Sequence, residues 1–482
     1  MAFESTKATI KQNKLVATTI VEFTKDLGEE KLDNILSVSG KSRVLRKEMN
    51  DKLTIYGKTK LDVNYVENGE LKNGLYDMEF SKVVDQDVTG DELVLIKETR
   101  ISAVNKEIRV VVTIELFGEN INIIPELKLD DANLFVRTEE SEVANASNIQ
   151  LGEFNLTNEY EEQGLYSIID KRAEIVDVKT LAGVDSYTVE GNLDVYLTLF
   201  NGEVKEVKKT IEFKQELAFT GLLPNEQLIA SLRLANFMAN VEAGEEKTNI
   251  IVTADVESQA FAVFFTQTKQ LIDVYSTTNV LETNREVVEY NKKIEKVTLS
   301  NNKEFVIDVP DDNLAEQLLY VNEVNFKEKN VELDNDKLVI TGDVTTNIVY
   351  YNENKEVCTK KQNFEITLEG KVVANHVRVM QTKANCTNCK IRFGKQIEIS
   401  INAEVDVLAF ETDYLVYITE VAEKEPLEKD NSPITVYVAV GGEDLFDVGK
   451  ALKVDPEQIK LQNKLGDQIS AKQKIFVYNK IV

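Results

Sequence analysis

The sequence predicts a mainly β protein, with three tandem antiparallel β-sandwich-like domains followed by a small C-terminal βααβ domain. Two observations predict the tandem domains. Apolar and polar residues alternate in many short runs, which is typical of half-buried antiparallel strands. A pattern of strand, glycine, strand and Asn-containing turn also occurs three times along the chain. The segment 433–482 follows a different pattern, with two short helical stretches between two strands.

The composition is that of a folded protein with several domains. Of the 482 residues, 43% are hydrophobic and 29% are charged. There are six prolines and no tryptophan. The core must therefore be built from Val, Ile, Leu, Phe and Tyr, which favour strands because branched and aromatic side chains pack well on a pleated face.

The formal net charge of −27 limits the choice of partners. An acidic surface repels the phosphates of nucleic acids and the head groups of anionic lipids, so we exclude nucleic acid as a partner. The chain also lacks a run of about 18 apolar residues, so we expect no membrane insertion. Its first residues contain no basic start followed by an apolar run, and we therefore expect the protein to begin its life in the cytosol.

Each repeat is centred on a glycine inside a strand-like run. Such a glycine typically marks a β-bulge or a close backbone approach. A turn with an asparagine follows each glycine, and a phenylalanine lies 23, 22 and 22 residues after it in the three copies. The glycines are Gly57, Gly191 and Gly342, the asparagines are Asn68, Asn201 and Asn352, and the phenylalanines are Phe80, Phe213 and Phe364.

The phase of the repeats and a polar, proline-containing stretch divide the chain. We expect β domains at 1–145, 146–278 and 279–425, each of a size suited to a β-sandwich. A linker is expected at 426–432. The remaining segment, 433–482, has seven lysines against six acidic residues and is thus far less acidic than the rest.

The C-terminal segment resembles a LysM domain. In that family a strand runs into a Gly-Asp-Thr-Leu-aromatic loop, followed by two helices and a strand. Glycan-binding LysM modules hold N-acetylglucosamine polymers beside this loop, so the resemblance implies a ligand site here. The matching residues are Gly442, Leu445, Phe446, Val448 and Asn463.

The loop departs from the LysM pattern at two carboxylates. Glu443 replaces the family's aspartate, and Asp444 replaces its threonine or serine. A carboxylate in place of a hydroxyl removes a hydrogen-bond donor and adds charge, which favours a protein ligand over a glycan. The expected binding residues are Gly442, Glu443, Asp444 and Phe446, with Asn463 facing them. The alternative is that Phe446 serves the small core of the module.

The three upstream repeats resemble SPOCS domains, most clearly in the third copy at 304–324, 336–351 and 414–421. SPOCS repeats followed by one LysM module resemble the clostridial spore-coat morphogenetic proteins. The resemblance implies a coat-assembly scaffold that docks through its LysM module on a coat-basement morphogenetic ATPase, with other coat proteins as further partners. It also implies residence in the mother-cell cytoplasm and then at the forespore surface.

Two other functions fit the sequence. One is a tether that binds peptidoglycan through the LysM-like module. The other is a self-assembling coat layer or appendage, in which exposed strand edges join copies of the chain. We expect no enzymatic activity, because the chain has a single histidine with no neighbouring nucleophile in a recognised arrangement.

All three cysteines and the only histidine lie in one stretch of 32 residues, 358–389, inside the third repeat. Cys386 and Cys389 have the CxxC spacing of a zinc knuckle, and Cys358 and His376 would complete a four-ligand structural zinc site. We expect no other cofactor. The alternatives are a reduced CxxC pair, a buried Cys358, or cross-linking of the cysteines in a mature coat.

Overall fold

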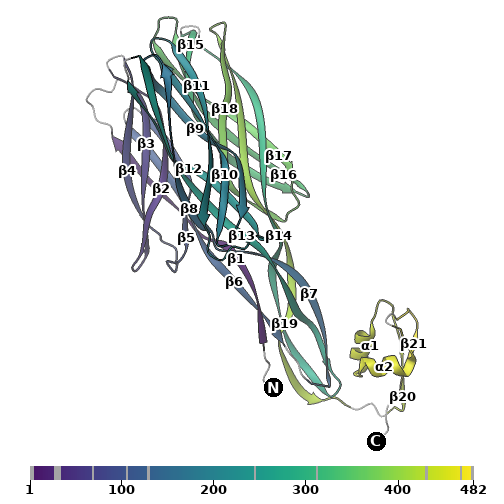
Figure 1. Cartoon of the computed structure of the whole chain (residues 1–482). Helices are drawn as coiled ribbons and strands as arrows, with labels where there is room; N and C mark the ends of the chain where they lie inside the picture. Colours follow the sequence, from purple (N-terminus) through teal and green to yellow (C-terminus); the bar gives the residue numbers. More distant parts are fainter. Residues whose placement is uncertain are drawn as a thin grey trace.

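The computed structural model is mainly β and contains three sandwich units of one topology (Figure 1). In each unit the first strand pairs with the last, and the last pairs with the one before it. The second, third and fourth strands form the opposing sheet. This confirms the expected mainly β, antiparallel class. The structure describes residues 5–26, 34–67, 70–104, 107–127, 131–243, 246–310, 313–428, 432–466 and 469–478.

The first unit has six strands. One sheet has the order β1-β6-β5 and the other β2-β3-β4. The strands are β1 (Ser5–Asp26), β2 (Asn34–Met49), β3 (Leu53–Glu67), β4 (Glu70–Val83), β5 (Leu93–Val104) and β6 (Glu107–Leu127).

The second unit repeats this pairing with a broken first strand. Both β7 and β8 pair with β13, which carries β12 on its other side, and the opposing sheet is β11-β10-β9. The backbone of Ser147 bonds to Ala262 at the break, so the two halves remain on one edge. The strands are β7 (Leu134–Ala146), β8 (Gln150–Gln163), β9 (Ser167–Ala182), β10 (Ser186–Phe200), β11 (Val204–Ala218), β12 (Gln227–Ala243) and β13 (Lys247–Ser276).

The third unit is again six-stranded, with sheets β14-β19-β18 and β15-β16-β17. Two of its strands are very long and extend beyond the sandwich, as β13 does in the second unit (Figure 1). The strands are β14 (Asn279–Asp308), β15 (Ala315–Asp334), β16 (Lys337–Asn352), β17 (Val357–Lys371), β18 (His376–Arg392) and β19 (Gln396–Pro426).

The strand pairing assigns strands to units and can be compared with the expected domain boundaries. The boundary expected between residues 145 and 146 falls at the end of β7, and β7 pairs with β13 of the second unit. Counting β7 with the second unit gives all three units the same pairing. The boundary expected at 278–279 coincides with the start of β14. Within the expected linker, residues 429–431 lie outside the described part of the chain, as does Asn68 of the first repeat turn.

The repeated phenylalanine joins the two sheets of each unit. Each one packs against a second phenylalanine from the first strand of the opposing sheet, at ring-centroid distances of 5.4, 5.4 and 4.1 Å. All three repeated phenylalanines are buried. They therefore lie where the two sheets meet to form each core. The pairs are Phe23–Phe80, Phe154–Phe213 and Phe305–Phe364.

The repeated glycine lies beside a β-bulge in all three units, as the sequence predicted. Gly57 faces the register shift of β2, Gly191 lies within one, and Gly342 faces that of β15. A side chain at Gly57 would collide with the Phe80 ring, which lies directly across the strand pair. The absence of a side chain therefore lets an aromatic ring lie flat on the central strand.

Apolar clusters also join the units where the long strands meet. One cluster contains Ile10 and Ile124 of the first unit, Val143 of the second, and Tyr290 and Leu415 of the third. Because side chains from all three units share this core, the units are packed together and are not separate beads on a string.

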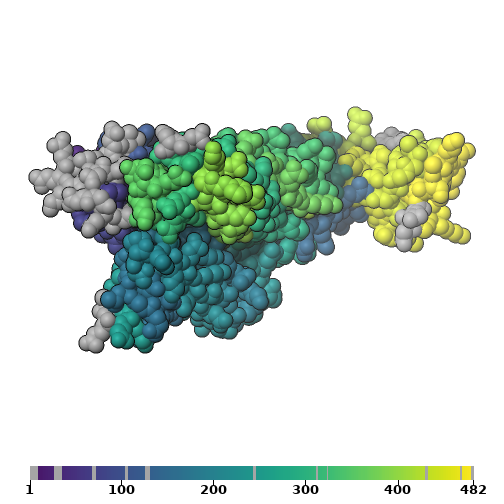
Figure 2. Space-filling view, turned by 90° about the horizontal axis from the view of Figure 1, so that it is seen from above, coloured from purple at the N-terminus to yellow at the C-terminus, as the bar shows by residue number. Residues whose placement is uncertain are grey.

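The C-terminal module has the expected order of strand, helix, helix and strand. Asp455 caps the second helix through the amide of Glu457 at 2.8 Å, and Pro456 begins that helix, as the sequence predicted. The module lies at one end of the molecule (Figure 2). Among the described residues, no helix is long and apolar enough to span a membrane. Its elements are β20 (Ile434–Val438), α1 (Leu445–Leu452), α2 (Pro456–Asn463) and β21 (Lys474–Tyr478).

Candidate functional site

Four of the five expected binding residues lie together between β20 and the first turn of α1. Gly442 is exposed at φ 80°, and nothing lies within 4 Å of where its side chain would be. The neighbouring Glu443 is turned back into the module. Its carboxylate accepts hydrogen bonds from the Tyr437 hydroxyl and from the backbone amide of Val440, at 2.8 Å for the latter. Glu443 therefore closes the loop.

Asp444 caps the first helix. Its carboxylate accepts a hydrogen bond from the amide of Asp447 at 2.9 Å, and the Asp447 carboxylate accepts one from the amide of Asp444 at 3.1 Å. This reciprocal capping box explains why carboxylates occur at these two positions. A carboxylate in the first turn also complements the positive end of the helix dipole.

Asn463 has a structural role at the end of α2. Its side-chain amide donates to the carbonyls of Ile459 and Phe476, at 3.0 and 2.7 Å, and its oxygen accepts from the amide of Phe476 at 2.7 Å. These bonds tie the second helix to β21. The Asn463 side chain is thus occupied by hydrogen bonds within the module. It does not face the first loop as expected.

The first helix of the module packs against the tip of the second unit. Arg137 of β7 pairs with Asp444 at 2.5 Å and with Asp447 at 2.9 Å. Its guanidinium also lies 4.5 Å from the centroid of the Phe446 ring. Two of the expected binding residues, Asp444 and Phe446, are therefore engaged within the chain itself.

Tyr275 of β13 forms the centre of this contact. Its ring packs edge-on against Phe446 at 5.1 Å, and its hydroxyl donates to the carbonyl of Val454 at 2.9 Å. Beside it, the ammonium of Lys450 lies 2.6 and 2.7 Å from the two carboxylate oxygens of Asp273. Aromatic, polar and charged contacts thus hold one face of α1 on the second unit.

The charges at this contact support each other. Burial alone would raise the pKa of Asp447, but the hydrogen bonds from Arg137 and from the Asp444 amide outweigh it and hold that pKa below its usual value. The hydrogen bond with Asp447 in turn raises the pKa of Arg137. Burial, followed by the nearby Asp455 carboxylate, raises the pKa of Tyr275, so its hydroxyl stays protonated as a donor.

The opposite face of the module is apolar and open. Ile434 and Val436 of β20 lie directly across from Tyr478 and Phe476 of β21, so the four side chains share one face of the two-stranded sheet. Val438 continues that face, and Lys474, directly across from it, places an ammonium group at the edge of the face. The five apolar residues, which we call the outer face of the β20–β21 sheet, are each between 39 and 51% exposed.

The cysteines and the histidine do not form the expected zinc site. His376 begins β18, and Cys386 lies ten residues further along the same extended strand, which places the two roughly 33 Å apart. Cys358 lies on β17, where its thiol contacts Asn313. The four ligands thus cannot surround one ion, and no group of three or more His, Cys, Asp or Glu among the described residues could hold a metal.

Cys386 and Cys389 do lie together. The register shift between Cys386 and Asn388 brings the two thiols into hydrogen-bond contact on the strand. That bond lowers the pKa of Cys386 and raises the pKa of Cys389. Both cysteines are free thiols, so the reduced CxxC pair is the alternative that the structure contains.

No family model, curated protein or solved structure matches the chain. The resemblances to SPOCS and LysM domains therefore rest on the sequence patterns alone.

Sequence reasoning missed the partners of the C-terminal module. Arg137 and Tyr275 lie on the first and last strands of the second unit, β7 and β13, in the segments LFVRTEE and LIDVYSTTN. Nothing in these strand-like segments indicates a contact with the C-terminal module. The available signal was that Arg137 is a lone arginine flanked by strand residues in an otherwise acidic region.

Proposed function

We propose that this chain is a non-catalytic scaffold of spore-coat assembly that docks through its LysM-like module on a coat-basement ATPase at the forespore surface. The SPOCS-like and LysM-like patterns support the setting. The outer face of the β20–β21 sheet supports the mode of binding, because it is a partly exposed apolar surface on a module whose opposite side is already held.

The apolar outer face is the observation that carries this proposal. Clusters of exposed apolar side chains on a folded surface typically mark a binding site for another macromolecule. The five apolar residues of this face offer one hydroxyl, that of Tyr478, and Lys474 adds one ammonium group at the edge, whereas a glycan site normally supplies several hydrogen-bonding groups. The module is also near neutral in charge, unlike the rest of the chain, so it can approach an acidic partner without strong repulsion.

The test uses the full chain with the outer face altered. Val436→Asp combined with Val438→Asp places two carboxylates on the face while leaving the buried side of the sheet intact. Val306→Asp is the matched control, because Val306 is a strand valine with 57% exposure on the third unit. We expect the double variant to lose capture by the purified ATPase by at least tenfold, and Val306→Asp to bind as the unaltered chain does.

The same experiment separates the other functions. Retention of the unaltered chain by purified spore peptidoglycan, without capture by the ATPase, would replace the proposal with a wall or cortex tether. Concentration-dependent filaments of the unaltered chain, unaffected by either set of substitutions, would favour a self-assembling coat layer. Equal capture of all three chains by the ATPase would place the docking site away from the outer face.

A further inference from the structure

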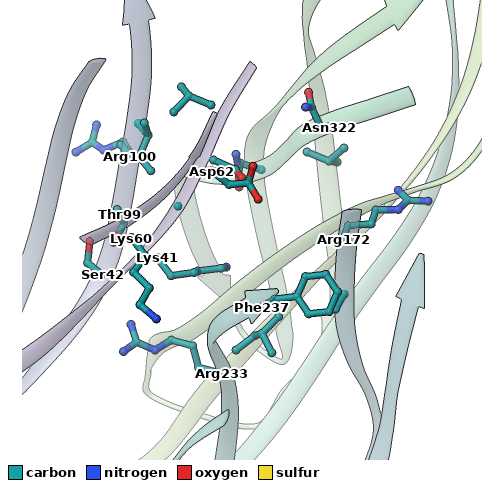
Figure 3. Close-up of a pocket in the computed structure, with 18 of the residues that line it drawn as sticks. Lys41, Ser42, Lys60, Asp62, Thr99, Arg100, Arg172, Arg233, Phe237 and Asn322 are labelled. Carbon is teal, nitrogen blue, oxygen red and sulfur yellow. The ribbon is translucent and has the colours of Figure 1, made fainter. Parts of the chain in front are cut away.

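A cleft of 1780 Å³ lies at the centre of the molecule, between the three units. Each unit contributes its two adjacent edge strands to the walls. These are β2 and β5 of the first unit, β9 and β12 of the second, and β15 and β18 of the third. Figure 3 shows side chains from different units pointing into this space. The cleft is therefore a product of the way the three units pack, and no single unit contains it.

The charge of the cleft is opposite to that of the molecule. Its lining contains twelve lysines and arginines against seven aspartates and glutamates, whereas the whole chain has a net charge of −27. Several of the cations have partners. Lys171, for example, lies 3.0 Å from Asp62, and the side chain of Arg172 donates to the carbonyl of Cys386 at 3.2 Å.

Two lysines of the first unit stand out because they lie side by side on neighbouring strands. Lys41 of β2 and Lys60 of β3 are directly opposite in the antiparallel pair, which brings their Cβ atoms to about 4.5–5.5 Å. Asp77 lies opposite Lys60 on β4 but pairs with Lys58 at 2.6 Å. Within the described part of the chain, neither Lys41 nor Lys60 has a carboxylate partner.

A third cation approaches from the second unit. Arg233 of β12 points toward Lys41 (Figure 3). The packing of the cleft walls around Lys41, and then the charge of Arg233, lower the pKa of Lys41, whose side chain nevertheless remains exposed to the water in the cleft. Arg233 is paired with Glu257, on the strand next to its own, through two hydrogen bonds from its guanidinium. Like charges placed directly across a strand pair are destabilising. The arrangement thus lacks two counter-charges, those of Lys41 and Lys60.

We propose that Lys41, Lys60 and Arg233 bind a small multivalent oxyanion of the phosphate class in the central cleft. Three cations from two units converge on one space, and a di- or trivalent anion between them would turn their repulsion into attraction. A long polyanion would have to cross the acidic exterior, whereas a small anion can enter the cleft by itself. Because two units supply the cations, the bound anion would also join those units.

The test titrates the full chain with inorganic pyrophosphate at low ionic strength, followed by calorimetry. We expect one site per chain, and a dissociation constant that rises at least tenfold in Lys41→Gln and in Lys60→Gln. Lys179→Gln is the matched control because Lys179 is exposed on β9 outside the cleft and its loss changes the net charge equally. That variant should bind within about twofold of the unaltered chain, as expected of a distant surface charge.

The thermal midpoints separate binding from a purely structural role of the lysines. Without pyrophosphate, Lys41→Gln should melt at or above the temperature of the unaltered chain, because a repulsion is removed. With pyrophosphate, only the unaltered chain and Lys179→Gln should gain stability. No heat of binding to the unaltered chain, equal weakening by all three substitutions, or a lower midpoint of Lys41→Gln without the anion would each overturn the proposal.

Discussion

The interior of the repeated units differs from the joint between the second unit and the C-terminal module in the kind of contact that stabilises it. Inside, a phenylalanine pair joins the two sheets of each unit, and the pattern recurs three times. At the joint with the C-terminal module, ion pairs of Arg137 and Lys450 with partly exposed carboxylates surround one ring contact, that of Tyr275 with Phe446. Apolar burial is worth more than exposed ion pairing and does not depend on pH. Changes inside a unit should therefore cost more stability than changes at the joint with the C-terminal module.

The largest effect is expected from removing a phenylalanine of the interior. Phe80→Ala and Phe364→Ala should each lower the free energy of unfolding by about 3–5 kcal/mol, because each loses a buried ring and leaves a cavity. Urea unfolding followed by circular dichroism measures this. Phe393→Ala is the control, since Phe393 is 97% exposed and should change stability by less than about 0.5 kcal/mol. An unchanged urea midpoint for Phe80→Ala would contradict the assigned core.

A second test sharpens the comparison between the first and third units. Gly57→Ala should cost about 1–3 kcal/mol by overpacking, because the new methyl group meets the Phe80 ring. The same substitution should cost much less when Phe80 is already alanine. In the third unit the methyl group of Gly342→Ala would meet Phe326 and the carbonyl of Lys327 instead.

Two double-mutant cycles measure this difference. The cycle of Gly57→Ala with Phe80→Ala should show coupling of about 1 kcal/mol or more, and the cycle of Gly342→Ala with Phe364→Ala should show almost none. Equal coupling in both units would mean that Phe364 covers Gly342 as Phe80 covers Gly57, which the strand register contradicts.

The sequence predicted this interior well because its signals are local and periodic. Alternation, the in-phase glycine and the phenylalanine all lie within one hairpin. It could not predict which ring covers the glycine. Phe213 and Phe364 both lie 22 residues after their glycines, yet only Phe213 is directly opposite its glycine. The turn of the third unit, 352–356, is two residues longer than that of the second, 201–203, and this shifts the partner of Gly342 to Ile366.

The joints could not be predicted from sequence for a different reason. Arg137 and Asp447 are 310 residues apart, and no local pattern connects them. The loop residues of the C-terminal module were correctly found to lie together, but their contacts depend on how that module packs on the second unit. The expected zinc site was wrong for the opposite reason, since it relied on residues that are close in sequence. Their closeness in sequence suggested one site, while an extended strand separates His376 from Cys386.

A smaller effect is expected when the joint with the C-terminal module is weakened. Arg137→Ala removes both ion pairs and the contact with Phe446, and each partly exposed ion pair contributes about 1 kcal/mol or less. The fold should persist while the module separates more often, which amide hydrogen exchange would report as faster exchange in α1 alone. Arg46→Ala, which removes an exposed pair with Glu48 in the first unit, should leave exchange in α1 unchanged.

The smallest effect expected is the pH dependence of this joint. The pKa of Asp447 is lowered when Arg137 is in contact, so the contact contributes stability at pH values above the unperturbed aspartate pKa of about 3.9. That contribution is lost as the pH falls through about 4 and below, because protonated Asp447 no longer pairs with Arg137. Small-angle scattering between pH 6 and pH 3 should show the module moving away in the unaltered chain. In Arg137→Ala the module should already separate more often at pH 6 and respond less to the fall in pH, and an identical pH profile for the two chains would show that another group controls the joint.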